Sequence, residues 1–407
     1  MNYLFNKIRE YLLAFNIGLG PVIWFMDFSL GSIKLILFIS LILLHFKVLL
    51  YKKTYRYWNF FLIIIFLLFI SLFKDLNYSN DKLLVLFTFI QNYYFFILGY
   101  YYINNNLISI RFIKSILSVV VFFCILTISN FIIGIPDWIQ PFQIQKFEEM
   151  QVHNYERFTS PLYSTGFGLA RTGWATTLSQ FIPLALILRE FKNNIFGNLS
   201  LLIITSSIVF TGSRGGLLIT LFIISIYIIL RLPLIKQFLI FLAIISISLF
   251  LVYSENSFLY EFYRLDSDDI STGRAILYNF VPEMLYEGGI LGLGYSGSIN
   301  FFSDKINSSI AFHNVYLRLM VDYGFIFGLI IIFISMFIIF KIIKIYIFNY
   351  NIEIVLISFV LISGIISGFL EPSAMYEARY WWIPFWFFCG VILNIYKYEK
   401  SSIYFRR

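Results

Sequence analysis

Three short segments in the second half of the chain combine residue types that bind anions and accept protons. They read TGSRGG at residues 211–216, STGR at 271–274 and FHNVYLR at 312–318. An arginine beside the free amides of a helix start is well suited to hold a phosphate, and a histidine at a helix start stays neutral and able to accept a proton. We therefore predict that Arg214 and Arg274 bind an anion and that His313 is a base.

Each segment also has a purely structural interpretation. In the first, Ser213 would cap a helix at a glycine turn while its arginine reaches lipid headgroups. In the second, a solvated Arg274 would open a short helix through Tyr278 that breaks near a proline. The glycine-rich stretch at 288–297 lacks the strand and lysine of a phosphate-binding loop. His313 could equally be a capping or interfacial residue.

Other polar residues have structural explanations. Arg318 and Asp322 are spaced to form an ion pair within a helix bundle, and the glycines at 324 and 328, and at 364 and 368, have the spacing of close helix packing. His45 lies in an apolar run and is expected to pack or to snorkel there, and His153 in a loop is expected to be solvated. The buried cysteines Cys124 and Cys389 predict no disulfide.

An acidic segment, DSDD at residues 266–269, contains a D-x-D pattern that could hold a divalent cation. Adjacent carboxylates in a loop are more often a solvated charge run, and the glutamates at 148, 149 and 156 are equally ambiguous. We predict no metal and no cofactor.

The elements that must position these residues are membrane helices. Sixty percent of the 407 residues are hydrophobic and only 13% are charged, with a mean hydropathy of +0.83. Runs of roughly 20 apolar residues, the length of a membrane span, recur about twelve times. We predict an all-α polytopic membrane protein, one integral membrane domain over 1–407. The predicted helices are 11–29, 32–50, 58–73, 83–103, 114–135, 171–188, 195–211, 217–230, 236–253, 313–340, 353–370 and 380–396.

The charge distribution predicts the orientation of these helices. If both termini are cytoplasmic, the inner connections hold most of the 30 lysines and arginines and few of the 22 acidic residues, as the positive-inside rule requires. The net charge of +8 is therefore a signal of topology, and no nucleic-acid partner is expected. The partner that this distribution does imply is the lipid bilayer.

Two predicted outer loops are long, at 136–170 and at 254–312, and the second, between the ninth and tenth helices, is expected to be partly helical. The arginines of the three segments then lie on the outer side, against the charge rule. The two halves of the chain do not match each other, which disfavours a transporter built from inverted repeats.

Taken in order, the three segments together with DYG at 322–324 resemble the superfamily of O-antigen polymerases and O-antigen ligases. The resemblance covers about residues 210–328, and the amino-terminal half is similar in hydropathy only. Arg171, in the segment LARTG at 169–173, also matches a position where such proteins carry an arginine.

The resemblance implies a glycosyltransferase of the bacterial inner membrane that takes a glycan from undecaprenyl diphosphate at the outer face, without metal. It implies that Arg214 and Arg274 bind the diphosphate and that His313 activates the acceptor hydroxyl. Supporting positions would be Arg171, Ser213, Tyr278, Asn314 and Arg318. A chain-length regulator and a flippase would be further partners.

The shared segments do not separate a polymerase of repeat units from a ligase that transfers the glycan to lipid A core. The short chain, rich in Phe, Ile and Tyr, and its divergent first half favour the polymerase. A lipid-linked oligosaccharide flippase or transporter is the third alternative, although the unusual charges gather on one side and not at mid-membrane.

Overall fold

A computed structural model gives the structure of the chain. It describes residues 2–23, 38–43, 45, 79–104, 109–133, 171–190, 194–231, 274–294, 297–306, 314–348, 352–370 and 383–397. His313, His153 and the acidic segment at 266–269 lie outside these residues, as do the glutamates at 148, 149 and 156. The predicted third and ninth helices, and most of the second, also fall outside them.

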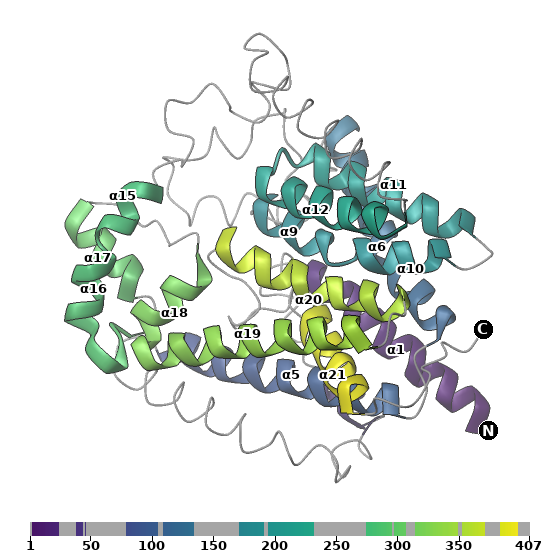
Figure 1. Cartoon of the computed structure of the whole chain (residues 1–407), viewed down its shortest axis with the longest axis horizontal. Helices are drawn as coiled ribbons and strands as arrows, with labels where there is room; N and C mark the ends of the chain where they lie inside the picture. Colours follow the sequence, from purple (N-terminus) through teal and green to yellow (C-terminus); the bar gives the residue numbers. More distant parts are fainter. Residues whose placement is uncertain are drawn as a thin grey trace.

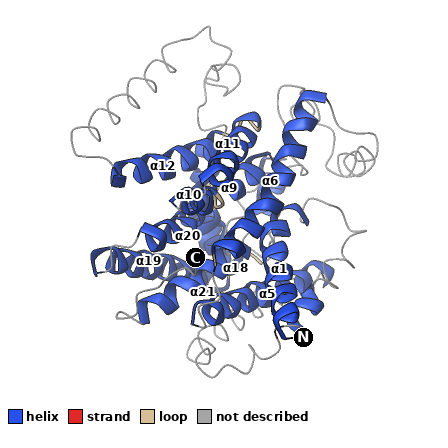
Figure 2. Ribbon diagram, turned by 90° about the vertical axis from the view of Figure 1, so that its right-hand side faces the viewer, coloured by secondary structure: helices blue, strands red, loops and turns tan. Residues whose placement is uncertain are grey.

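Every long regular element in the described ranges is a helix, which confirms the predicted all-α class (Figure 2). The helices are α1 (Asn2–Ile23), α5 (Ser79–Asn104), α6 (Ile110–Ile133), α9 (Arg171–Ser179), α10 (Ile182–Glu190), α11 (Asn194–Phe210), α12 (Arg214–Arg231), α15 (Arg274–Asn279), α16 (Val281–Gly288), α17 (Gly297–Ile306), α18 (Val315–Tyr323), α19 (Phe325–Phe348), α20 (Ile352–Leu370) and α21 (Ile383–Lys397), with a 3₁₀ helix η4 (Gly289–Leu291).

Within the described ranges, four helical stretches are long and apolar enough to cross a membrane. They are Ile110–Ser129, Arg214–Arg231, Phe325–Tyr346 and Ile352–Leu370, and further apolar helices such as α11 and α21 are shorter. A continuous helix satisfies its own backbone hydrogen bonds, which is the condition for crossing hydrocarbon. The chain is therefore a polytopic membrane protein.

Two predicted single helices are each interrupted, so those two predictions were wrong in detail. The predicted helix 171–188 consists of α9 and α10, separated by a turn at Gln180 and Phe181. Pro183 explains the break, because its ring would clash with the carbonyl of Ser179 four residues earlier. The predicted helix 313–340 consists of α18 and α19, separated by Gly324 with a φ of 102°.

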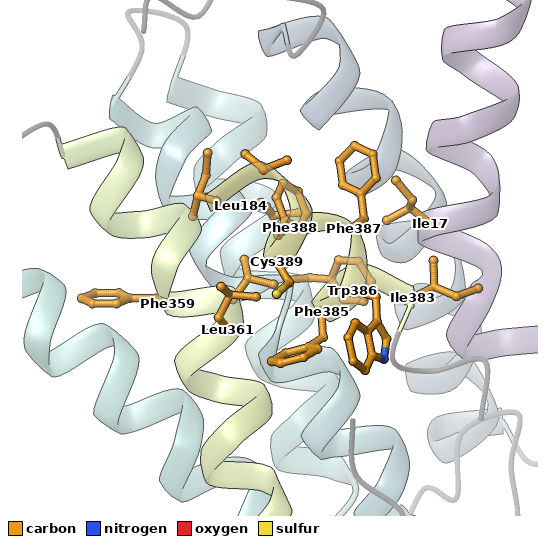
Figure 3. Packing of buried hydrophobic residues seen from close by; sticks show 14 of the residues in the cluster. Ile17, Leu184, Phe359, Leu361, Ile383, Phe385, Trp386, Phe387, Phe388 and Cys389 are labelled. Carbon is orange, nitrogen blue, oxygen red and sulfur yellow. The ribbon is translucent and has the colours of Figure 1, made fainter. Parts of the chain in front are cut away.

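The core is formed by helices that are distant in sequence. Figure 3 shows Phe385 and Phe387 of α21 among Ile17 of α1 and Leu361 of α20, and all four are buried. The glycine pairs allow the close packing that their spacing predicted: a Cβ on Gly364 would lie 2.5 Å from the Phe385 ring. The prediction of buried cysteines is also confirmed, since Cys124 and Cys389 are buried and free.

His45 is likewise a packing residue, as predicted. It is fully buried, and its Nε2 lies 2.7 Å from the Tyr102 hydroxyl. It belongs to the helical core and not to the candidate site.

The short helices that precede α19 in the sequence gather at one end of the bundle. In Figure 1, α15, α16, α17 and α18 lie together at the left, beyond the start of α19, whereas α1 begins at the opposite end. This arrangement confirms that the second long loop is partly helical, and it places α15 and α18, which belong to the second and third sequence segments, close to one end of the membrane helices.

Candidate active site

Three predicted site arginines share one structural position. Arg171, Arg214 and Arg274 are the first residues of α9, α12 and α15. The first amides of a helix have no partner within it, and the helix dipole places partial positive charge there. The side chain of Arg214 adds to that charge at the start of α12, so this helix start is suited to an anion.

The turn before α12 is held by its own hydroxyl groups. The Ser213 backbone N–H donates to Thr211 Oγ1 at 3.2 Å, and the Gly216 N–H donates to Ser213 Oγ at 3.3 Å. Gly212 has a φ of 60°, which a glycine adopts without strain. The prediction that Ser213 caps the helix is confirmed. Its side chain is buried, so it fixes the turn that presents Arg214, which is half-buried.

The two glycines after Arg214 have different neighbours. A Cβ on Gly216 would lie 2.4 Å from the Cβ of Ala175 in α9, whereas a Cβ on Gly215 would meet the Leu370 side chain of α20 at 3.5 Å. The backbone of α12 is therefore pressed directly against α9. The carboxyl end of α20 lies beside the same turn.

Contacts at the far end show that α9–α10 and α12 run in the same direction. Glu190, at the end of α10, accepts a hydrogen bond from the Tyr227 hydroxyl and pairs with Arg231, at the end of α12. Because the two helical segments meet at both ends in the same order, Arg171 and Arg214 lie at the same end of the bundle.

The third segment is fixed to the carboxyl end of α20. Asn314 caps α18, because its Oδ1 accepts from the backbone N–H groups of Tyr316 at 3.0 Å and Leu317 at 3.1 Å. The Tyr316 hydroxyl donates to the Ile365 carbonyl at 3.0 Å, and its ring lies 4.7 Å from the Phe369 ring, between centroids. His313 directly precedes this capped helix.

The carboxyl end of α20 thus joins the first and third segments. Gly368 lies against the Tyr316 ring, at 2.9 Å from the position of its missing Cβ, and Leu370 contacts Gly215 two residues further on. The sequence segments did not include α20, and Tyr316 was not among the predicted site residues. Its place in FHNVYLR was the only signal in the sequence.

The glycine-rich stretch that follows α16 has a structural role. The backbone N–H groups of Leu293 and Gly294 donate to the carbonyls of Val321 and Asp322 at 2.8 and 3.0 Å. A Cβ on Gly292 would lie 2.4 Å from the Gly324 nitrogen, so only glycine permits this approach. The stretch packs against the end of α18 and links the second segment to the third.

A buried ion pair strengthens that link. Arg318 Nε donates to Asp322 Oδ2 at 3.1 Å, and Asp322 Oδ1 accepts from the Ser298 N–H at the start of α17 at 2.8 Å. The Arg318 and Asp322 side chains are 6% and 1% exposed. The predicted pair is confirmed, and it holds α17 to α18.

The remaining predicted residues are placed by backbone position or burial. The predicted break near Pro282 is confirmed, because α15 ends at Asn279 and α16 begins at Val281. Tyr278, in α15, packs against a small apolar cluster that includes Leu277 and Met284. Within the part of the chain that the structure describes, no three His, Cys, Asp or Glu side chains gather to hold a metal ion.

The fold and these contacts define a class: an all-helical membrane protein in which two polar segments from distant parts of the sequence, at the starts of α12 and α18, meet at the carboxyl end of α20. Residues 199–333 match the family model described as O-antigen ligase. The match spans all three segments and the start of α19, and it supports the resemblance of this part of the chain to the superfamily of O-antigen polymerases and ligases. No curated relative matches the chain.

Proposed function

We propose that this chain is a surface-polysaccharide polymerase that joins undecaprenyl-diphosphate-linked repeat units at the outer face of the bacterial inner membrane, with both termini cytoplasmic. The observation that carries the proposal is the convergence, inside the matched region, of the Arg214 helix start and the helix that follows His313. The family is one of glycosyltransferase-like enzymes, so enzyme function is supported at that general level.

The proposed reaction is a single displacement with inversion. The acceptor hydroxyl oxygen forms a bond to the anomeric carbon of the donor sugar, while the bond from that carbon to the diphosphate oxygen breaks. His313 takes the hydroxyl proton, and undecaprenyl diphosphate leaves with the bonding electrons. A placed base typically contributes about 10² to 10⁴ in rate.

In this proposal the role of the arginines is to stabilise the leaving diphosphate. Negative charge grows on it as the bond breaks, and cations fixed beforehand stabilise that charge without reorganisation. Arg214 and Arg274 would hold the two phosphates, and Arg171 would support them. Each charge-assisted hydrogen bond contributes about 1.5 to 3 kcal/mol. The mechanism uses no metal.

The second candidate is an O-antigen ligase, which would use the same donor and transfer the glycan to lipid A core. The description of the matching family model favours it. The short, aromatic-rich chain with its divergent first half favours the polymerase.

Deletion of the gene followed by lipopolysaccharide electrophoresis tests both. A polymerase deletion leaves core bearing one repeat unit. A ligase deletion leaves bare core, with polymer accumulating on undecaprenyl diphosphate. An unchanged ladder would contradict both functions.

A further inference from the structure

An exposed apolar surface lies on the helices outside the bundle. Tyr286 of α16 is 90% exposed and Ile290 of η4 is 67% exposed, and Leu291 beside it is also exposed. The opposite side of α16 is buried, where Met284 packs in a small apolar cluster with Phe302 of α17. We call Tyr286, Ile290 and Leu291 the α16 surface.

The α16 surface is continuous with the beginning of a membrane span. A Cβ on Gly324 would lie 2.0 Å from the Ile290 carbonyl oxygen and 2.9 Å from the Leu291 carbonyl carbon, so these backbones touch. The next two residues, Phe325 and Ile326, are exposed as well. They open α19, whose stretch Phe325–Tyr346 is the most apolar of the spans that the structure describes.

This continuity determines the depth of the α16 surface along the membrane normal. The first residues of an apolar span lie at the boundary between headgroups and hydrocarbon. Since the η4 backbone is in direct contact with that point of α19, Ile290 and Leu291 lie at the same boundary. Tyrosine is enriched at this level, because its ring is apolar and its hydroxyl reaches water.

The charged residues nearby agree with contact at the boundary and not with deeper insertion. Glu283 of α16 forms a hydrogen bond with Lys305 of α17 at 2.7 Å, and both side chains are about half exposed. This hydrogen bond raises the pKa of Lys305, so its ammonium group remains charged and is best placed in contact with water. Glu283 lies three residues before Tyr286 on the same face of α16, so the pair keeps the Tyr286 end of the α16 surface at the level of the headgroups.

We propose that the α16 surface, with Phe325 and Ile326, is seated in the acyl chains and headgroups of the bilayer and anchors α15–α17 to the membrane. The occupant of this surface is phospholipid. Apolar patches of this kind in water mark sites of membrane or protein contact, and the continuity with α19 selects the membrane. The inference is independent of the glycosyl transfer.

Spin labelling of the full-length protein in phosphatidylcholine vesicles tests the proposal. Ile290→Cys and Leu291→Cys place a nitroxide on the α16 surface, and Ser303→Cys, at an exposed position on α17, is the matched control. The native cysteines are buried, and the unsubstituted protein measures their background labelling. Surface substitutions of this kind usually change stability by less than about 0.5 kcal/mol, and thermal unfolding verifies that each variant is folded.

We expect the labels at 290 and 291 to be relaxed by oxygen and protected from a water-soluble nickel chelate, with an oxygen-to-nickel accessibility ratio several-fold above that at 303. Nickel accessibility at 290 and 291 equal to that at 303 would show a solvated surface and overturn the proposal. Protection from both oxygen and nickel would also overturn it, because protein would then cover the surface, either another segment of this chain or a second copy.

Discussion

Adding one methyl group at either of two adjacent glycines should separate the effects of packing at the start of α12. In Gly216→Ala the new Cβ would lie 2.4 Å from the Ala175 Cβ and 2.9 Å from its carbonyl carbon, so the backbone of α9 or α12 must move. In Gly215→Ala the nearest atom is a Leu370 methyl at 3.5 Å, an ordinary contact.

The magnitude follows from comparing the two variants. Replacing a helical glycine by alanine restricts the unfolded chain and stabilises by about 0.4 to 1 kcal/mol where the site accepts it. This gain is common to both variants and cancels in the comparison. Forcing an extra carbon into a packed site costs about 1 to 3 kcal/mol. We expect Gly216→Ala to be less stable than Gly215→Ala by about this amount.

The assay is thermal unfolding of the two purified proteins in the same detergent, with glycan ladders from complemented cells as a second measurement. A displacement of about 1 Å can cost about 100-fold in rate. Gly216→Ala should therefore also shorten the ladder, since it shifts Arg214 relative to Arg171. Equal unfolding midpoints for the two variants would refute the argument that α9 and α12 are in backbone contact at this turn.

Three further predictions concern the ion pair, the proposed chemistry and the metal. Asp322→Asn keeps the side-chain shape but removes the negative charge that faces the buried Arg318, so it should lower the free energy of unfolding by about 3 to 5 kcal/mol. Glu283→Gln, at the exposed pair, should lower it by at most about 1 kcal/mol. Equal unfolding midpoints for the two variants would contradict this. At unchanged protein levels, Arg214→Ala should slow polymer synthesis by about 10- to 150-fold, and His313→Ala should slow it by about 10² to 10⁴. A wild-type ladder from His313→Ala would show that His313 is not the base. EDTA should leave in vitro activity unchanged, and loss of activity that Mg²⁺ restores would contradict the metal-free mechanism.

The sequence predicted most of the described membrane helices, because an apolar run of sufficient length has few other stable structures. It did not predict the two interruptions. Averaging hydropathy over a window hides a single turn, so the break at Gln180 was missed although Pro183 was visible four residues after Ser179. Gly324 was interpreted as a packing glycine, and residue spacing does not show the positive φ that it adopts between α18 and α19.

The chemistry-bearing segments were visible in the sequence, but their connection was not. Residue types identified Arg214 and Asn314, whereas the structure joins them through Leu370 and the Tyr316 contact with Ile365. Such contacts link residues at least 49 positions apart in an apolar background, where many tyrosine and leucine pairs would be equally compatible with the pattern. Local spacing carries no information on which pair forms.

The two ends of α12 show why the position of Arg214 matters for function. Arg231 ends the helix, where the macrodipole favours a cation, and it also pairs with Glu190. Arg214 begins the same helix, where the dipole opposes a cation, so its placement there lowers the stability of the helix. A diphosphate would reverse the sign of that effect, because the dipole and the guanidinium then attract the same anion. Arg231→Ala is accordingly the matched control for Arg214→Ala: it removes an arginine from the same helix and should leave the glycan ladder intact.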